Sequence, residues 1–301
     1  MNHNIGLKVL FVINPGAGSN NNSWENIISD YFTGKPFIPD YYLLEKKPVV
    51  EKLRQYISDT KPAYVIAVGG DGTVGMLAKI IAGSSIALGI LPAGSANGMA
   101  KELDISEVPE DALAVIETGE VRCCDAIRIN EKDLCLHLSD IGLNAQLIKY
   151  FDEGKLRGIW GYAKVVLKTL WRKQKMLVRI TTKTEEIERI AFMVVVANAS
   201  KYGTGAVINP DGKLDDGLFE VVIVRKLAIS ELLKMLFRFT PFNPQKIETF
   251  HATTLRIETH KRMHFQIDGE YKGKINKINA TILPNHINLV LPAAKPEDTG
   301  S

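Results

Sequence analysis

The spacing of apolar residues changes near residue 120. Before that point, short apolar runs at 7–13, 41–44, 63–68 and 86–91 alternate with segments whose apolar residues recur at helical spacing. The predicted helices cover 24–32, 49–60, 74–82 and 109–118, the last opening at a proline and closing before a glycine. Strands that alternate with helices predict an α/β domain in which helices cover both faces of a parallel sheet.

After residue 120 most runs are alternating or β-branched, and only two helical patterns interrupt them, near 155–172 and 229–238. This half predicts an all-β sandwich or barrel-like domain with antiparallel strands. We place an α/β domain at 1–124 and a β-sandwich domain at 125–294, with the option that the final strand returns to the first domain. Residues 295–301 are predicted to be a frayed tail.

Composition places the chain in the ordinary globular class, with 301 residues of which 46% are hydrophobic. The first apolar run is too short for a signal or membrane-spanning helix, so we expect a cytoplasmic protein without a transmembrane segment. The net charge is only +3, yet residues 149–175 hold eight basic and two acidic residues. We expect no nucleic-acid partner, and a homodimer is compatible with the sequence.

Three glycine-rich turns, at 14–19, 69–73 and 92–98, each follow a predicted strand. In a parallel sheet the carboxyl ends of the strands meet at one edge, where ligands bind. Each turn also lies near the start of a helix, where backbone amides and the helix dipole favour an anion. The sequence therefore predicts a phosphate-binding edge formed by all three turns.

The ligand at this edge is better explained as ATP with Mg²⁺ than as a dinucleotide. Gly70, Gly72 and Gly75 match the dinucleotide fingerprint, but residues 91–95 contain no acid to hold the ribose. Asp71 lies inside the loop, where its carboxylate would repel a pyrophosphate unless a cation intervened. Mg²⁺ bound by a carboxylate and phosphate oxygens removes this conflict. The chain has no Walker-type P-loop sequence.

The segments NPGAGS, GGDGT and PAGSAN, in this order, resemble the nucleotide-binding motifs of the diacylglycerol kinase catalytic domain family. The family includes bacterial lipid kinases and the sphingosine and ceramide kinases. The resemblance extends over nearly the whole chain through three later segments, SDIGLNA at 139–145, NPDGKLDDGLFEVVIV at 209–224 and QIDGE at 266–270. It implies a three-layer α/β domain that binds ATP and a C-terminal β-sandwich, with the active site in the cleft between them.

The resemblance also implies an ATP- and Mg²⁺-dependent lipid kinase of phospholipid metabolism, whose acceptor is a hydroxyl of diacylglycerol, a sphingoid base or a related lipid. The implied nucleotide-binding residues are Asn14, Pro15, Gly16, Gly18, Gly69, Gly70, Gly72, Thr73, Pro92, Gly94, Ser95 and Asn97. The implied metal ligands are Asp216, the carbonyls of Lys213 and Leu218, and Asp71. An acidic β-turn entering a strand is the alternative interpretation of 213–217.

Two acids near the C-terminal end are candidates for chemistry. From Thr254 to Asp268 the even-numbered positions are polar, so a strand is predicted to bury its odd face. If the strand continues, Asp268 and Glu270 project on one side, roughly 7 Å apart, where they could polarise a substrate hydroxyl and help to hold Mg²⁺. The alternative is a surface turn at Asp268 and Gly269. Glu270 is our first choice for the general base; Asp71 is the other, since sphingosine-kinase-like enzymes favour the acid of GGDGT.

The chain departs from the family pattern at two places. Gly98 stands where many bacterial relatives have an acid, and residues 19–22 lack the lysine often found after the second glycine of the first loop. An NAD kinase-like enzyme and a non-catalytic nucleotide- or lipid-binding module therefore remain as alternatives.

A lipid kinase must reach a membrane surface. The helical pattern near 155–172 has basic residues at helical spacing beside an apolar face, namely Lys164, Lys168 and Arg172. This predicted helix either docks on anionic lipid headgroups or packs on the β-sandwich. The segment 236–244 is a second candidate for lipid contact.

Overall fold

The computed structural model describes residues 6–17, 23–152, 175–198, 212–226 and 247–293. The chain divides into two compact units, which comprise 1–124 with 286–301, and 125–285. It passes from one unit to the other within β5 (Glu120–Ile129) and again within β14 (Glu270–Leu291). The predicted frayed tail, 295–301, lies outside the described residues.

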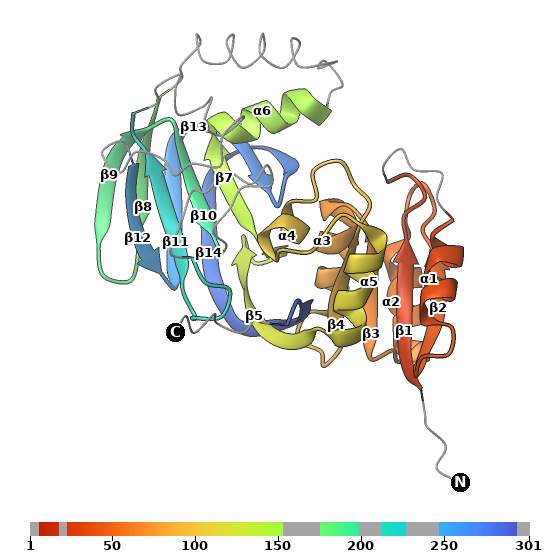
Figure 1. Cartoon of the computed structure of the whole chain (residues 1–301). Helices are drawn as coiled ribbons and strands as arrows, with labels where there is room; N and C mark the ends of the chain where they lie inside the picture. The colour runs from red at the N-terminus through yellow and green to blue at the C-terminus, as the bar shows by residue number, and fades with distance from the viewer. Residues whose placement is uncertain (1–5, 18–22, 153–174, 199–211, 227–246, 294–301) are drawn as a thin grey trace, which may run out of the picture. The chain divides into compact units, whose positions relative to one another are not determined.

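The first unit contains a parallel sheet in the order β14-β4-β3-β1-β2, of which β14 contributes only its end (Figure 1). Its elements are β1 (Leu7–Ile13), α1 (Trp24–Phe32), β2 (Phe37–Leu43), α2 (Val50–Thr60), β3 (Tyr64–Gly69), α3 (Asp71–Ile81), β4 (Ala87–Pro92), α4 (Gly98–Glu102) and α5 (Pro109–Thr118). The central strands β1, β3 and β4 are almost entirely buried, as continuous apolar runs predict.

The helices of this unit form two groups: α1 contacts α5, and α2 contacts α3. Right-handed crossovers from β1 to β2 and from β2 to β3 run in opposite directions along the sheet, which places the two groups on opposite faces.

Two predicted boundaries were wrong. The strand expected at 41–44 begins at Phe37, since Pro39 sits on the edge strand, where no ladder N–H is needed. The helix predicted at 49–60 begins one residue later, at Val50, because Val49 is its N-cap residue.

The second unit is built from antiparallel strands. Its elements, with parts of β5 and β14, are β6 (Asp133–Cys135), β7 (Leu138–Gly142), α6 (Leu143–Asp152), β8 (Met176–Thr181), β9 (Glu186–Ala191), β10 (Met193–Ala197), β11 (Phe219–Val224), β12 (Ile247–Ala252) and β13 (Thr254–Ile267). One layer has the order β12-β11-β10-β7-β13-β14, while β9 extends β8 and β8 pairs with β13 (Figure 1).

The long strand β13 takes part in both layers of this sandwich. Residues 256–259 pair with β8, and residues 265–267 pair with β7. A register shift between Glu258 and Met263 separates the two parts. Leu255, Ile257 and residues from the other strands fill one apolar core.

Helix α6 was not predicted from the sequence. It follows β7 directly, and the change of direction occurs at Gly142, whose φ is +120°. A Cβ at this position would collide with the carbonyl oxygen of Phe192. Leu143 and Leu147, four residues apart, are buried on the helix face that packs on β7 and β13. The helical patterns predicted near 155–172 and 229–238 lie outside the described residues.

Candidate functional site

The three glycine-rich turns meet at one edge of the parallel sheet, as predicted. They follow β1, β3 and β4, which are neighbours in the sheet. Asn14 in the first turn donates from Nδ2 to Thr73 Oγ1 at 3.2 Å, and its own Oδ1 accepts from the backbone amide of Gly16 at 3.0 Å. The amide of Ala93 donates to the carbonyl of Gly69 at 2.9 Å, which joins the second and third turns. Gly18 lies outside the described residues.

The second and third turns pack backbone against backbone. A Cβ added at Gly94 would lie 2.5 Å from Gly70 Cα, and one at Gly70 would lie 3.1 Å from Gly94 Cα. Gly69 is similarly restricted, because its Cβ would collide with Thr73. A Cβ at Gly75 would have no neighbour within 4 Å. The last glycine of the dinucleotide fingerprint, which should permit close packing between helix and strand, therefore has no such role here.

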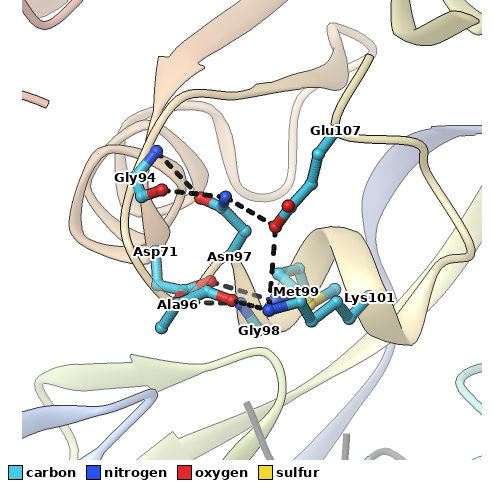
Figure 2. Close-up of polar contacts among 8 residues, drawn as sticks. All are labelled: Asp71, Gly94, Ala96, Asn97, Gly98, Met99, Lys101 and Glu107. Carbon is cyan, nitrogen blue, oxygen red and sulfur yellow. Dashed lines mark hydrogen bonds and ion pairs between the residues drawn. The ribbon is translucent and has the colours of Figure 1, made fainter. Parts of the chain in front are cut away.

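Asp71, the first residue of α3, uses its carboxylate to hold the next loop (Figure 2). Its Oδ2 accepts from the backbone amide of Gly98, and its Oδ1 accepts from that of Met99, both at 2.9 Å. These are the first two residues of α4, so an acid from another turn satisfies two amides that no residue within the helix can pair. The start of this helix was expected to offer free backbone amides to a bound anion. For Gly98 and Met99 this expectation was wrong, because both amides donate to Asp71.

Asn97 is buried in left-handed backbone, with φ at +51°, and its side chain closes the third loop. Its Oδ1 accepts from the amide of Gly94 at 2.9 Å, while Nδ2 donates to the Gly94 carbonyl at 3.0 Å and to Glu107 at 3.1 Å (Figure 2). Pro92 ends β4 and is buried, whereas Ser95 is exposed. Asn97 thus shapes the loop, and Ser95 lies at its surface.

In the second unit, Asp268 and Glu270 do not share one continuous strand. Strand β13 ends at Ile267 and β14 begins at Glu270, and these two residues pair directly. Asp268 and Gly269 form the two-residue loop with φ of +47° and +82°, as a type I′ hairpin turn requires. The prediction that both acids project from one side of an extended strand was wrong, because the Asp-Gly pair turns the chain.

The Asp268 carboxylate is an anchor for this hairpin. Oδ2 accepts from the amide of Leu136 at 2.9 Å, and Oδ1 accepts from the amides of His137 and Leu138 at 2.9 and 3.1 Å. Burial raises the pKa of Asp268 above its ordinary value, and the hydrogen bonds to Leu136 and His137 oppose this shift. Both oxygens are therefore engaged with the segment that leads into β7.

Asp140 of β7, unlike the partly exposed Asp268, is buried, and it contacts the same hairpin through Gln266. It accepts from Gln266 Nε2 at 2.5 Å, from Asn144 Nδ2 at 2.6 Å and from the backbone amide of Ala145 at 2.9 Å. Burial raises its pKa to about 6, although these three hydrogen bonds lower it. Gln266 occupies an even-numbered position of β13 yet is fully buried, which departs from the predicted polar face.

Glu270 differs from both acids because its side chain is 49% exposed. Its Oε2 lies 2.6 Å from Lys272 Nζ, two residues along the same strand. Of the two candidate acids of this hairpin, Glu270 is exposed and Asp268 is only partly exposed.

The predicted metal loop, 213–218, precedes β11. Asp216 is exposed, and its Oδ1 accepts from the amide of Leu218 at 3.0 Å. The buried carboxylate of Asp125 accepts from the amide of Gly217 at 2.6 Å and from that of Asn285 at 2.8 Å. The groups that the sequence predicted as ligands, the carboxylate of Asp216 and the carbonyls of Lys213 and Leu218, would supply only oxygen atoms, the ligand type that Mg²⁺ prefers. No group of three or more His, Cys, Asp or Glu side chains placed to hold a metal occurs in the described part of the chain.

Comparison with known protein families identifies the chain. The family model for the diacylglycerol kinase catalytic domain matches residues 8–129, and the model for the YegS C-terminal NAD kinase beta sandwich-like domain matches 139–291. The chain belongs to the diacylglycerol kinase catalytic domain family. The predicted resemblance and fold class are thereby confirmed, and the chain is a kinase, a class of enzyme that uses a nucleotide.

Members of the family and solved structures agree with this assignment. The chain is 29% identical over 250 residues to a probable lipid kinase YegS-like protein of Chromohalobacter salexigens, covering 80% of each. It is 27% identical over 248 residues to a diacylglycerol kinase of Bacillus subtilis, covering 77% of this chain and 79% of that protein.

Two solved structures share the fold. A putative diacylglycerol kinase from Bacillus anthracis aligns with a TM-score of 0.75 at 22% identity, covering 94% of this chain and 96% of that one. An NAD kinase from Archaeoglobus fulgidus in complex with ATP aligns with a TM-score of 0.54 at 12% identity, covering 94% and 93%.

For this member of the kinase family, the sequence had not singled out Asp125, Asp140 or Gln266. Asp125 interrupts an apolar run, and that interruption was the available signal for it. Asp140 follows Ser139, and Gln266 lies in an alternating polar and apolar segment, so no comparable local signal distinguished these two residues. The basic segment 155–175 and the segment 236–244 hold the predicted lipid contacts, and both lie outside the described residues apart from Lys175. Within the residues that the structure describes, no helix is long and apolar enough to cross a bilayer.

Proposed function

We propose that this kinase transfers the γ-phosphate of ATP to a hydroxyl of diacylglycerol, a sphingoid base or a related lipid, with Mg²⁺. In this proposal, 1–124 is the ATP-binding domain and 125–294 is the lipid-substrate domain. The observation that carries the proposal is the convergence of the three glycine-rich turns around Asp71 at one sheet edge.

The nucleotide phosphates are assigned to this edge. The proposed contacts are Asn14, Pro15, Gly16 and Gly18 from the first turn, Gly69, Gly70, Gly72 and Thr73 from the second, and Pro92, Gly94, Ser95 and Asn97 from the third. The close approach of Gly70 to Gly94 supports this assignment, because the absence of side chains lets the second and third turns meet at one place on the sheet edge. The engaged side chain of Asn97 favours a role in loop shape and not in direct contact.

Asp71 and the Asp216 loop are the proposed metal-binding groups. When bound, Mg²⁺ neutralises charge on the transferred phosphoryl group. Asp216 would hold it with the carbonyls of Lys213 and Leu218. Asp71 offers lone pairs beyond the two amides that it accepts, because an ionised carboxylate has about four acceptor positions.

Glu270 is the proposed general base, which accepts the proton of the acceptor hydroxyl. Its exposure supports this role, whereas three backbone amides hold Asp268 in place and two hold Asp71. Asp268 is therefore proposed to act through hairpin geometry. The role of Asp71 as the base is the alternative within this mechanism.

A lipid acceptor requires access to a membrane surface. The excess of basic residues between 149 and 175 supports peripheral attachment to anionic headgroups from the cytoplasm.

One observation favours a second function, a nucleotide- or lipid-binding module without catalysis. Gly98 replaces an acid found in many bacterial relatives, and its amide is occupied by Asp71.

Incubation with γ-labelled ATP, Mg²⁺ and a panel of lipids in detergent micelles tests the proposal. The panel contains diacylglycerol, a sphingoid base, ceramide and, as soluble acceptor, NAD. Labelled lipid in the wild type and none with Glu270→Gln supports the lipid kinase. ATP binding without labelling of any lipid supports the non-catalytic module, and labelled NAD supports the NAD kinase alternative.

A further inference from the structure

Asp140 joins three separate parts of the second unit. The residue is 1% exposed, and its carboxylate receives hydrogen bonds from β13 through Gln266 and from α6 through Asn144 and Ala145. All three partners act as donors, so the ionised carboxylate matches them. The group thereby fixes the start of α6 against β13.

Gln266 carries the connection onward to the hairpin tip. Its Nε2 donates to Asp140 at 2.5 Å, and its Oε1 accepts from the backbone amide of Gly269 at 2.8 Å. Its own carbonyl oxygen accepts from Ser139 Oγ at 2.7 Å. Two consecutive hydrogen bonds therefore lead from Asp140 to Gly269, the residue directly before Glu270.

The direction of this chain of hydrogen bonds depends on the negative charge of Asp140. An acceptor at position 140 requires Gln266 to point its NH₂ group inward and its oxygen toward Gly269. Without that acceptor, the amide of Gln266 loses its preferred orientation, and the reversed amide would face the Gly269 N–H with a second donor. A donor facing a donor cannot hold the turn.

Packing alone does not account for a carboxylate at this position. Burying an ionised group is costly, and replacement of buried charges by apolar side chains is often neutral or stabilising. The negative charge of Asp140 does fix the orientation of the Gln266 side-chain amide, because only its NH₂ end can donate to the carboxylate. The oxygen end then accepts from Gly269, in the turn directly before Glu270.

We propose that Asp140, acting through Gln266, is a positioning residue that fixes the Asp268–Gly269 turn and thereby places the Glu270 carboxylate for phosphoryl transfer. This inference rests on the proposed function, in which Glu270 is the base. Misplacement of such a group lowers the rate of the chemical step, with little effect on nucleotide binding.

The test uses the full chain with ATP and the lipid that the wild type labels best. Asp140→Asn should lower kcat by about tenfold to a hundredfold while KM for ATP changes by less than about threefold. The double variant Asp140→Asn with Gln266→Glu reverses donor and acceptor, and it should recover most of kcat. Thr259→Val is the matched control, because it removes a different buried polar group of β13, a hydroxyl that donates to the Lys261 carbonyl, and it should retain kcat. If Asp140→Asn does not fold, Gln266→Met breaks the same link and should give the same loss of kcat.

Amide hydrogen exchange at Gly269 provides a readout that does not need activity. Asp140→Asn should speed this exchange by about tenfold or more, and the double variant should restore it. Unchanged kcat in a folded Asp140→Asn, or a double variant no better than the single one, would overturn the proposal. If the wild type phosphorylates no lipid, the proposed function fails. Faster exchange of the Gly269 amide in Asp140→Asn that is restored in the double variant would still support the positioning of the turn. Exchange in Asp140→Asn equal to that of the wild type would overturn the positioning as well.

Discussion

The carboxylate of Asp71 accepts a hydrogen bond from the backbone amide of Gly98 at 2.9 Å. The amide at the start of α4 thus pairs with the acid of the preceding glycine-rich loop. A negative charge at the start of α4 also interacts favourably with the helix dipole. Asp71 therefore contributes to the conformation of the proposed nucleotide-binding edge in addition to its proposed role in catalysis.

Removal of the Asp71 carboxylate should affect both stability and turnover. Asp71→Ala leaves the buried amides of Gly98 and Met99 unpaired, which should lower the free energy of unfolding by about 1–3 kcal/mol. Denaturant unfolding measures this change, and the labelled-ATP assay should show turnover reduced by at least about a hundredfold. Glu107→Gln in the same cluster is the control, with an exposed side chain and little expected change. Full turnover in a folded Asp71→Ala protein would remove Asp71 from the mechanism.

The contact between Gly70 and Gly94 leads to a second prediction. Gly94→Ala places a Cβ 2.5 Å from Gly70 Cα, so the two loops must separate, at a cost of about 1–3 kcal/mol. ATP affinity, measured by calorimetry, should fall together with thermal stability.

Gly75→Ala is the matched control for this substitution. It lies within α3, where an added Cβ meets no atom within 4 Å, and alanine should stabilise the helix by up to about 1 kcal/mol. Equal ATP affinity in Gly94→Ala and Gly75→Ala would contradict the assignment of phosphate binding to this edge.

Much of the first unit was predictable from the sequence because its signals are local. Continuous apolar runs ending in glycine-rich turns predicted the buried strands, and parallel pairing then required the turns to share one edge. The contacts of Asp71 with Gly98 and Met99 were not predictable. They join residues 27 and 28 positions apart, and no local pattern specifies which amides a loop carboxylate will reach.

The second unit shows where alternation of polar and apolar residues is insufficient. The alternation correctly predicted that odd-numbered side chains of β13 are buried. It also placed Gln266 on the solvent-facing side of the strand, because the pattern contains no information on which elements cover the even-numbered face. Here α6 and Asp140 cover that face. The turn at Asp268 and Gly269 had a local signal, the Asp-Gly pair, but its anchoring by residues 136–138 depends on long-range packing.

Asp140 should make stability depend on pH. Its pKa is raised from 3.8 to about 6 in the folded protein, so the folded state binds more protons than the unfolded state between these values. The free energy of unfolding therefore decreases as pH rises through this window, by about 3 kcal/mol in total for this group. In Asp140→Asn this contribution is absent. Urea unfolding between pH 4 and 7.5 should show the wild type losing about 3 kcal/mol relative to the variant, and parallel pH profiles would contradict the assignment.

The neighbouring acids of the hairpin should respond in opposite ways to loss of charge. Glu270→Gln removes an exposed carboxylate, so stability should change by less than about 0.5 kcal/mol while kcat falls by about 10²–10⁴. Asp268→Asn keeps a residue that tolerates left-handed backbone but places an NH₂ group near amide donors, which should cost about 1–3 kcal/mol.

Paired measurements of unfolding free energy and kcat separate these roles for the two acids. Lys272→Met is the control for Glu270→Gln, because it removes the ion pair and leaves the proposed base in place. Its kcat should stay within about threefold of the wild type, since an exposed ion pair contributes little. If Glu270→Gln retained full kcat while Asp268→Asn lost it without destabilisation, Glu270 would be excluded as the base and the assignment would pass to Asp268.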